Sequence, residues 1–291
     1  PGITAMSASA SREKRPRDLR VNLVQHAAGR DPRDNLNNLE KMLAAAPAAD
    51  LTLLPEVFAL RGSGQDYRDA AETIPGPLCR WAADQARRRR TWLLAGSIVE
   101  SAGRRRYNTS LLFDSRGRLA ARYRKIHLFS VTLPNGKRLR EQAVYDAGRQ
   151  PVVADVAGWR CGLSICYDLR FPELYRRHAE AGAHILLVPA DFTRTTGRAH
   201  WRQLLLARAI ENQAFVIAAN QCGRNPANGV ESYGHSLAVD PWGRILAEAG
   251  GRATVLQTRL DFRVLEEVRA RLPALAHRRQ LPRAMPAAGP T

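Results

Sequence analysis

Short apolar segments alternate with amphipathic segments along most of the chain, and this alternation restricts the fold more than any other feature. Apolar segments of strand length recur eight times, at residues 20–25, 51–54, 92–99, 109–113, 160–165, 185–188, 215–219 and 236–239. Four longer segments carry apolar residues at helical spacing, at residues 34–46, 76–90, 197–212 and 261–272. The alternation predicts an α/β fold in which helices cover a sheet. Every apolar segment is too short to span a bilayer, so we expect no membrane partner.

Two five-residue segments, 114–118 and 240–244, are predicted to be hairpin turns. Each begins with Asp and has Gly at its fourth position, where a positive φ is needed. Antiparallel strand pairs therefore mix with the α/β units. No linker or change of composition divides residues 19–272, which we expect to form one domain. Residues 1–18 are expected to be a disordered arm, of which 1–5 precede Met6 as a tag remnant, and residues 273–291 an extended, Pro-rich tail.

The chain is strongly basic, with 45 Lys and Arg residues against 27 Asp and Glu residues and a formal net charge of +18. Only four of the basic residues are lysines. Such a charge attracts anions, and nucleic acid is one candidate partner. The basic residues are scattered, however, apart from local clusters at 87–90 and 104–106, and no recognisable nucleic-acid module accompanies them. We therefore expect a solvated basic surface, no nucleic-acid partner and an anionic small substrate.

Cysteine and histidine usage argues against several kinds of site. The four cysteines are too few and too irregularly spaced for a disulfide scaffold, which predicts a cytoplasmic protein. Neither paired metal-ligand spacings nor a His-Glu-x-x-His helix occurs, so no metal is expected. The segment 61–65 lacks the spacing of a phosphate-binding glycine loop. We expect no cofactor.

The segment 160–174 joins a buried strand to a helix through a polar turn. Cys166 stands at the junction, and Pro172 suits the first turn of the helix. Side chains alternate along a strand, so Cys166 faces away from residues 161, 163 and 165. At such a junction a thiol can reach a substrate while a main-chain N–H binds an oxyanion. The pattern favours Cys166 as a nucleophile, although a buried and inert cysteine is the alternative, and it is the one we expect for Cys79, Cys161 and Cys222.

A nucleophilic thiol needs a base, and four residues could assist it. Glu56 follows the apolar segment 51–54, where a partly desolvated carboxylate is suited to proton transfer. Lys125 has apolar flanks and could lower the pKa of a thiol or bind an oxyanion. His127 and His235 also flank apolar segments, so a Cys-His pair remains open on the residues alone.

Three motifs follow one another along the chain: Leu53-Leu-Pro-Glu56, Tyr123-Arg-Lys125-Ile-His-Leu-Phe and Leu163-Ser-Ile-Cys166-Tyr-Asp-Leu-Arg-Phe-Pro-Glu. In this order they resemble the motifs of the carbon-nitrogen hydrolase (nitrilase) superfamily. The similarity covers residues 19–281 and continues through 189–192, 195–201, 207–212 and 233–243. The resemblance implies a four-layer α-β-β-α sandwich that assembles as a homodimer or a higher homo-oligomer.

The resemblance also implies roles for individual residues. It makes Glu56 the general base, Lys125 the stabiliser of the tetrahedral intermediate and Cys166 the nucleophile. Glu141 falls at the place of the superfamily's additional active-site glutamate, although the following segment 145–148 departs from the usual pattern. The implied reaction is cofactor-independent hydrolysis of a small linear amide through a cysteine thioester, with release of ammonia.

Within the superfamily, the segments 219–224, 232–236 and 272–279 look most like the deaminated glutathione amidase and omega-amidase branch. That branch implies an amide that carries a carboxylate. Arg170 and Thr196 match its substrate contacts, and a main-chain N–H near Tyr167 is expected at the oxyanion. The structural alternatives are an ion pair of Arg170 with Glu173 or Asp168 and a helix-capping role for Thr196. Asp191 departs from the superfamily, which often has a small residue there.

Several activities remain open at this stage. A nitrilase or an N-carbamoyl amino acid amidohydrolase could use the same three residues, because attack on a nitrile also gives a hydrolysable thio intermediate. A different class, a basic nucleic-acid-binding protein on an inactive amidase scaffold, would bind in a salt-sensitive way without Cys166. The predicted activity is that of an amidase acting on non-peptide carbon–nitrogen bonds.

Overall fold

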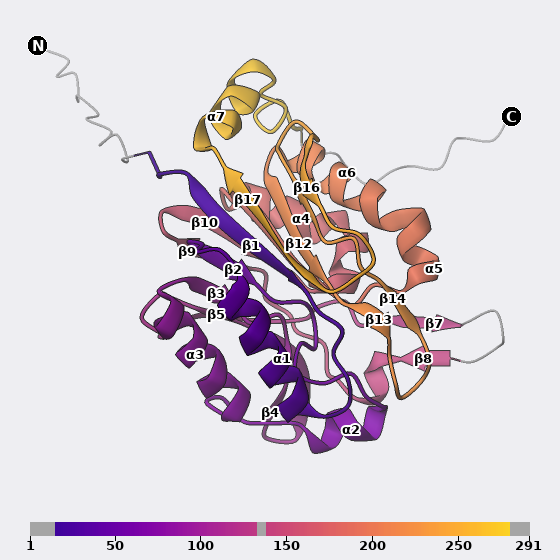
Figure 1. Cartoon of the computed structure of the whole chain (residues 1–291). Helices are drawn as coiled ribbons and strands as arrows, with labels where there is room; N and C mark the ends of the chain where they lie inside the picture. The colour runs from indigo at the N-terminus through magenta and orange to yellow at the C-terminus, as the bar shows by residue number, and fades with distance from the viewer. Residues whose placement is uncertain (1–14, 133–137, 280–291) are drawn as a thin grey trace, which may run out of the picture.

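Two β-sheets lie face to face in the computed structural model of the chain, which describes residues 15–132 and 138–279 (Figure 1). The first sheet has, in order, β17 (Thr254–Leu260), β1 (Leu19–Gln25), β2 (Leu51–Leu53), β3 (Trp92–Leu94), β5 (Arg105–Phe113) and β4 (Ile98–Ala102), and β6 (Leu119–Arg124) also pairs with β5. The second has β16 (Ile245–Glu248), β15 (Leu237–Val239), β12 (Phe215–Asn220), β11 (Ile185–Ala190), β10 (Trp159–Leu163) and β9 (Val152–Val156). Parallel pairs at the centre and antiparallel pairs outside them confirm the expected mixture.

Helices cover the outer face of each sheet, which completes four layers (Figure 1). The outer layer of the first sheet is α1 (Pro32–Ala45) with α3 (Pro77–Arg89), and that of the second is α4 (Pro172–Glu180) with α6 (Arg202–Asn212). The last helix, α7 (Phe262–Arg271), follows β17. The predicted α-β-β-α sandwich is confirmed.

The core follows from side-chain alternation along the strands. In β3, Leu94 packs between the two sheets, whereas Leu93 packs beneath α1 and α3. In β1, Leu23 and Val24 divide in the same way. Strands buried on both faces carry apolar residues at adjacent positions, such as Leu23-Val24 in β1 and Leu93-Leu94 in β3, and such positions were the signal that predicted these strands.

One predicted strand, 92–99, is two strands in the structure. The chain leaves β3 at Ala95 and re-enters the sheet as β4, with Gly96 at φ +33° between them. A Cβ at Gly96 would lie 1.8 Å from the carbonyl oxygen of Pro55, so only glycine allows this close approach. The break brings Ser97 beside the segment that follows β2.

Other differences lie at edges and ends. The predicted helix 197–212 begins earlier, with a turn at α5 (Arg194–Thr196) capped by Thr193, and continues through a π-turn (Gly197–Trp201) into α6. The hairpin turns 114–118 and 240–244 are confirmed, with Gly117 at φ +78° and Gly243 at φ +89°. The sequence did not predict β6, β9, β16 or β17, whose mixed polar and apolar residues suit partly exposed strands.

Smaller elements complete the described chain. They are α2 (Gly64–Asp69), the pair β7 (Ser130–Thr132) and β8 (Arg138–Arg140), the pair β13 (Cys222–Arg224) and β14 (Glu231–Tyr233), and 3-10 turns at Glu141–Ala143 and Cys166–Arg170. Most of the predicted arm, residues 1–14, and of the predicted tail, residues 280–291, lies outside the described residues. In the two described ranges, no helix has the combined length and apolarity needed to cross a membrane.

Candidate active site

A cavity of about 410 Å³ opens where the chain leaves the ends of β2, β6 and β10. Glu56 follows β2, Lys125 follows β6 directly, and Cys166 follows β10. The cavity lining includes all seven residues that the sequence placed in the site: Glu56, Lys125, Glu141, Cys166, Tyr167, Arg170 and Thr196. Positions that are up to 140 residues apart along the chain thus converge on one space.

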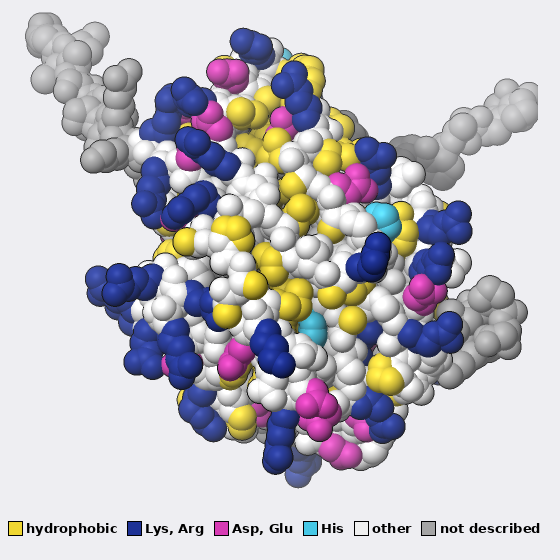
Figure 2. Space-filling view, in the orientation of Figure 1, with side chains coloured by type: hydrophobic (Ala, Val, Ile, Leu, Met, Phe, Trp, Pro, Cys, Tyr) yellow, Lys and Arg dark blue, Asp and Glu magenta, His cyan; other side chains and the backbone are white. Residues whose placement is uncertain are grey.

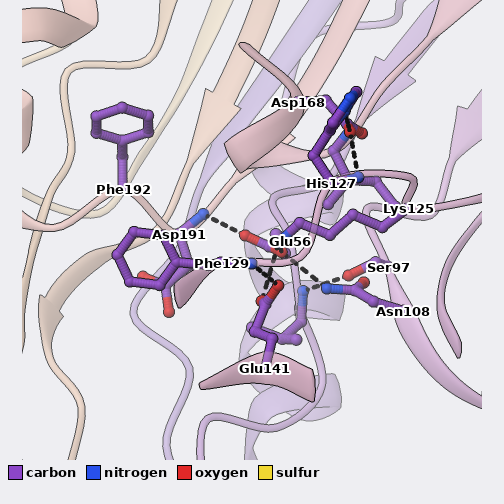
Figure 3. Close-up of polar contacts among 12 residues, drawn as sticks. Glu56, Ser97, Asn108, Lys125, His127, Phe129, Glu141, Asp168, Asp191 and Phe192 are labelled. Carbon is purple, nitrogen blue, oxygen red and sulfur yellow. Dashed lines mark hydrogen bonds and ion pairs between the residues drawn. The ribbon is translucent and has the colours of Figure 1, made fainter. Parts of the chain in front are cut away.

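Lys125 lies between two carboxylates (Figure 3). Its Nζ donates to Oε1 of Glu56 at 2.8 Å and to Oε1 of Glu141 at 2.9 Å, and its side chain is only 1% exposed. Burial alone lowers the pKa of a lysine, but the charges of Glu141 and Glu56 raise the pKa of Lys125 well above its usual value. The ammonium therefore stays charged inside the cavity wall.

The carboxylate of Glu56 is held by donors on both oxygens. Asn108 Nδ2 donates to Oε1 at 2.8 Å, and the main-chain N–H of Asp191 donates to Oε2 at 2.9 Å (Figure 3). The backbone of the same segment is fixed as well, because Val57 N donates to Ser97 Oγ at 3.0 Å. The break between β3 and β4 therefore helps to position Glu56.

Glu141 is held by the segment that precedes β7. The main-chain N–H of Phe129 donates to Oε2 of Glu141 at 2.7 Å, and Glu141 N donates back to the carbonyl of Phe129 at 2.9 Å (Figure 3). Burial raises the pKa of Glu141, Lys125 opposes this effect, and the charge of Glu56 adds to it. Lys125, Glu56 and Glu141 together carry one positive and two negative charges. This cluster of net negative charge can accept a proton on a carboxylate.

Cys166 lies at a sharp turn between β10 and α4. Its φ of +46° is unusual for a residue with a side chain, and its side chain is aimed at the cavity, where the residue remains 8% exposed. By contrast, Cys161 and Ile165 have no exposed surface. Burial and the nearby Glu56 carboxylate raise the pKa of the Cys166 thiol well above its usual value, although Lys125 lowers it. The thiol therefore needs a base to take its proton, and the Glu56 carboxylate lines the same cavity.

The predicted substrate contacts Arg170 and Thr196 line the same cavity as Cys166 and Lys125. Arg170 stacks over the ring of Phe192 at 5.0 Å, and among the described residues no carboxylate lies within ion-pair distance of it. The expected alternative of an ion pair with Glu173 or Asp168 is therefore absent. Thr196 bonds Thr193 Oγ1 at 2.9 Å, and Thr193 rather than Thr196 caps α5. The guanidinium of Arg170 therefore lines the cavity without a carboxylate partner among the described residues.

The family model for carbon-nitrogen hydrolases matches residues 20–270. The chain belongs to the carbon-nitrogen hydrolase family.

Relatives of this hydrolase are named as amidases. A deaminated glutathione amidase from Yersinia enterocolitica is 39% identical over 90% of this chain and 94% of its own length. Omega-amidase NIT2-B from Xenopus laevis is 36% identical over 90% of this chain and 95% of its own length. The hydrolase is therefore an amidase acting on non-peptide carbon–nitrogen bonds, as predicted, and the nucleic-acid-binding alternative is not favoured.

Solved structures give the same result. A CN-hydrolase superfamily protein from Xanthomonas campestris, with an arsenic adduct in its active site, has a TM-score of 0.82 at 32% identity and covers 92% of this chain and 99% of its own. An amidase from Nesterenkonia has a TM-score of 0.73 at 29% identity, covers 89% of this chain and 99% of its own, and was captured with acrylamide added to its active-site cysteine. The prediction of a cysteine-dependent amidase is confirmed.

The two histidines considered as bases do not line the cavity of the hydrolase. His127 Nδ1 lies 2.8 Å from Asp168 Oδ1, and its ring stacks on Phe171 with centroids 3.7 Å apart. His235 stacks on Tyr233. Glu56 is thus the base candidate that the geometry brings to the thiol.

Sequence reasoning missed three residues that support the site. Asn108 holds Glu56, Asp168 holds the segment around Lys125, and Arg61 lies buried next to Asp191. A signal existed for Asn108, a polar residue directly before the predicted strand 109–113, and its side chain is 1% exposed in the structure. Arg61 gave none, because one arginine among 41 is inconspicuous in the sequence.

Proposed function

We propose that Cys166 of this amidase hydrolyses a small linear amide that carries a carboxylate. One observation carries the proposal: Cys166, Glu56, Lys125 and Glu141 line a single cavity, with Lys125 Nζ within 2.9 Å of both carboxylates. The names of the relatives, deaminated glutathione amidase and omega-amidase, support an amide of this kind. Arg170 supplies the guanidinium that binds the carboxylate through two hydrogen bonds.

The reaction begins with proton transfer from the Cys166 thiol to Glu56. The sulfur then attacks the amide carbon, and the negative oxygen of the tetrahedral intermediate is stabilised by the Lys125 ammonium and by the main-chain N–H of Tyr167. The protonated Glu56 gives its proton to the departing nitrogen, so that the C–N bond breaks and ammonia leaves. A thioester on Cys166 remains.

Water completes the cycle. Glu56, again ionised, takes a proton from a water molecule that attacks the thioester carbon. The C–S bond breaks, the sulfur recovers a proton from Glu56, and the acid is released. Glu141 positions Lys125 through the 2.9 Å contact and keeps the ammonium directed toward the cavity.

Ammonia release tests this mechanism directly. The substrates are deaminated glutathione, 2-oxoglutaramate, simple aliphatic amides, N-carbamoyl amino acids and nitriles. We expect carboxylate-bearing amides to be hydrolysed fastest and Cys166→Ala to lower kcat by at least about 10⁴-fold. Cys79→Ala, which changes a buried cysteine of α3 that does not line the cavity, is the matched control. Normal ammonia release by folded Cys166→Ala would overturn the nucleophile assignment.

We also propose a homo-oligomer in a reducing compartment, the cytoplasm. Exposed apolar side chains support assembly: Ile210 of α6 is 52% exposed and Trp242 of the neighbouring turn is 54% exposed. All four cysteines are free, which suits a reducing environment. Light scattering of the purified protein tests the first point, and a monomer at micromolar concentration contradicts it.

None of the steps proposed above uses the basic surface. Lys and Arg side chains are spread over the visible face in Figure 2 and are interleaved with acidic ones. Several of the exposed arginines form ion pairs, such as Arg87 and Arg88 with Asp84. A surface of this kind favours solubility rather than one specific polyanion site.

A further inference from the structure

One carboxylate in the cavity wall has no role in the proposed reaction. Asp191 follows β11, and its main-chain N–H donates to Glu56 Oε2 at 2.9 Å (Figure 3). This contact fixes Asp191 beside the proposed base. Its side chain lines the same cavity as Cys166 and is 20% exposed. A bound substrate can therefore reach this carboxylate.

Two side chains hold one oxygen of Asp191. Ser232 Oγ donates to Oδ1, and Arg61 Nη1 donates to the same hydroxyl at 2.7 Å while lying 3.6 Å from Oδ1. Arg61 is itself only 1% exposed and is fixed by a 2.9 Å hydrogen bond from Nε to the carbonyl of Ala28. Across residues 15–132 and 138–279, no donor binds Oδ2 of Asp191. One oxygen is anchored, and the other is available to a ligand.

The charges around Asp191 favour a cationic ligand group. The two negative charges of Glu56 and Glu141 exceed the single positive charge of Lys125, and the charge of Arg61 offsets that of Asp191. This end of the cavity therefore has a net negative charge. Burial raises the pKa of Asp191, Arg61 opposes the effect, and the charge of Glu56 adds to it. A cation against Oδ2 relieves this repulsion and forms a charge-assisted hydrogen bond.

An unneutralised cation lies close by in the same cavity. Arg170 is stacked on Phe192, the residue next to Asp191, and both arginine and aspartate line the cavity. A carboxylate acceptor and a guanidinium donor thus flank Phe192. A ligand that carries an ammonium and a carboxylate on one carbon satisfies both groups at once.

We propose that Asp191 is a specificity-determining residue that binds the ammonium group of the substrate, so that this amidase prefers the ω-amide of an α-amino acid to its 2-oxo counterpart. The proposal rests on the proposed function, because Arg170 takes the substrate carboxylate and Cys166 the amide. Asp191 has no part in the bond changes. Its contribution is to binding, through Oδ2 alone.

L-Glutamine and 2-oxoglutaramate test the proposal, because the two amides differ only in an amino or oxo group at one carbon. The wild-type enzyme is expected to have the higher kcat/KM for L-glutamine. In Asp191→Asn, the anchored oxygen still accepts from Ser232, but an amide N–H₂ replaces Oδ2 and opposes an ammonium. We expect kcat/KM for L-glutamine to fall about 10–100-fold, mainly through KM, and that for 2-oxoglutaramate to change less than about threefold.

Two further variants keep the test decisive. Arg61→Gln combined with Asp191→Asn removes both buried charges together and is expected to keep the altered preference while restoring stability that the single variant loses. Glu231→Gln changes a neighbouring acid that pairs with Arg194 outside the cavity, and it is expected to leave the preference unchanged.

The outcomes separate the two proposals. A wild-type preference for 2-oxoglutaramate, or an equal loss on both amides in Asp191→Asn, overturns the role of Asp191. Ammonia release from other amides but from neither member of this pair overturns it as well. If no amide releases ammonia, the proposed function fails first.

Discussion

Oδ1 of Asp168 lies 3.0 Å from the main-chain nitrogen of His127, and this hydrogen bond joins the turn after Cys166 to the segment after Lys125. The same carboxylate accepts from Tyr123 Oη at 2.7 Å and from Ile165 N at 2.9 Å. The two oxygens of Asp168 therefore bind residues before and after Lys125, and also Ile165, the residue before Cys166. One buried side chain thus links the segments that carry these two groups.

Asp168→Asn is expected to disturb both stability and catalysis. Asparagine has one acceptor oxygen and places an N–H₂ against the N–H donors that now converge on Oδ1 and Oδ2. We expect the free energy of unfolding to fall by about 3 kcal/mol and kcat/KM to fall about 10–100-fold. Urea unfolding and ammonia release measure the two effects. Asp155→Asn, at an exposed position of β9, is the control, and equal behaviour of the two variants would contradict the role of Asp168.

Lys125→Met is expected to lower kcat about 10²–10³-fold, because the oxyanion loses a fixed cation. The variant also leaves Glu56 and Glu141 without the charge between them, so we expect it to unfold at lower urea concentration. Steady-state ammonia release from the folded variant checks the catalytic part. Lys41→Met, on the exposed face of α1, controls for loss of a lysine, and an unchanged kcat in Lys125→Met is the result that would remove Lys125 from the mechanism.

The sequence predicted the central strands and the covering helices because these elements are buried in regular patterns. Ile185 to Val188 and Phe215 to Ala219 are continuous apolar runs in the centre of the second sheet. The break at Gly96 was not predictable, because its cause is the approach of Pro55 from another segment. Edge strands such as β16 carry a weak pattern since one face is exposed.

Some residues of the candidate site could be predicted from the local sequence, and others could not. Cys166 was identified from a local pattern, the strand–turn–helix junction, and the structure places it at such a turn with φ +46°. Glu141 rested on resemblance alone, since nothing nearby in the sequence shows that it meets Lys125. The Arg61–Ser232–Asp191 contacts join three distant segments, and no local rule predicts them.

Arg170→Met is expected to affect substrates according to their charge. The guanidinium lacks an acidic partner among the described residues, so its removal leaves no buried acid unpaired and changes binding more than folding. We expect KM for carboxylate-bearing amides to rise about 10–100-fold, with little change for propionamide, which has no carboxylate. Arg198→Met, at an exposed position of the π-turn, is the control. A parallel rise of KM for both kinds of amide would indicate a structural role instead.

Buried histidines are expected to make the fold sensitive to mild acid. His178 of α4 is fully buried, with Nε2 2.9 Å from the carbonyl of Leu163, and burial lowers its pKa to about 4 from 6.5. Below pH 6.5 the unfolded chain takes up a proton that the folded chain refuses, so the free energy of unfolding decreases as the pH falls from 6.5 toward 4. The loss approaches about 3 kcal/mol for this one histidine over the full interval.

The variant His178→Gln keeps an N–H donor for the carbonyl of Leu163 but cannot titrate. The free energy of unfolding is measured with urea at about pH 7.0 and at about pH 4.5, which covers most of this interval. Between these two pH values, we expect His178→Gln to lose less of its free energy of unfolding than the wild type. The same comparison with His277→Gln, an exposed histidine, should reproduce the wild-type loss because its environment changes little on unfolding. If all three proteins lose the same free energy of unfolding, the acid sensitivity comes from groups other than His178. The buried imidazole of His178 then does not limit the acid stability of the enzyme.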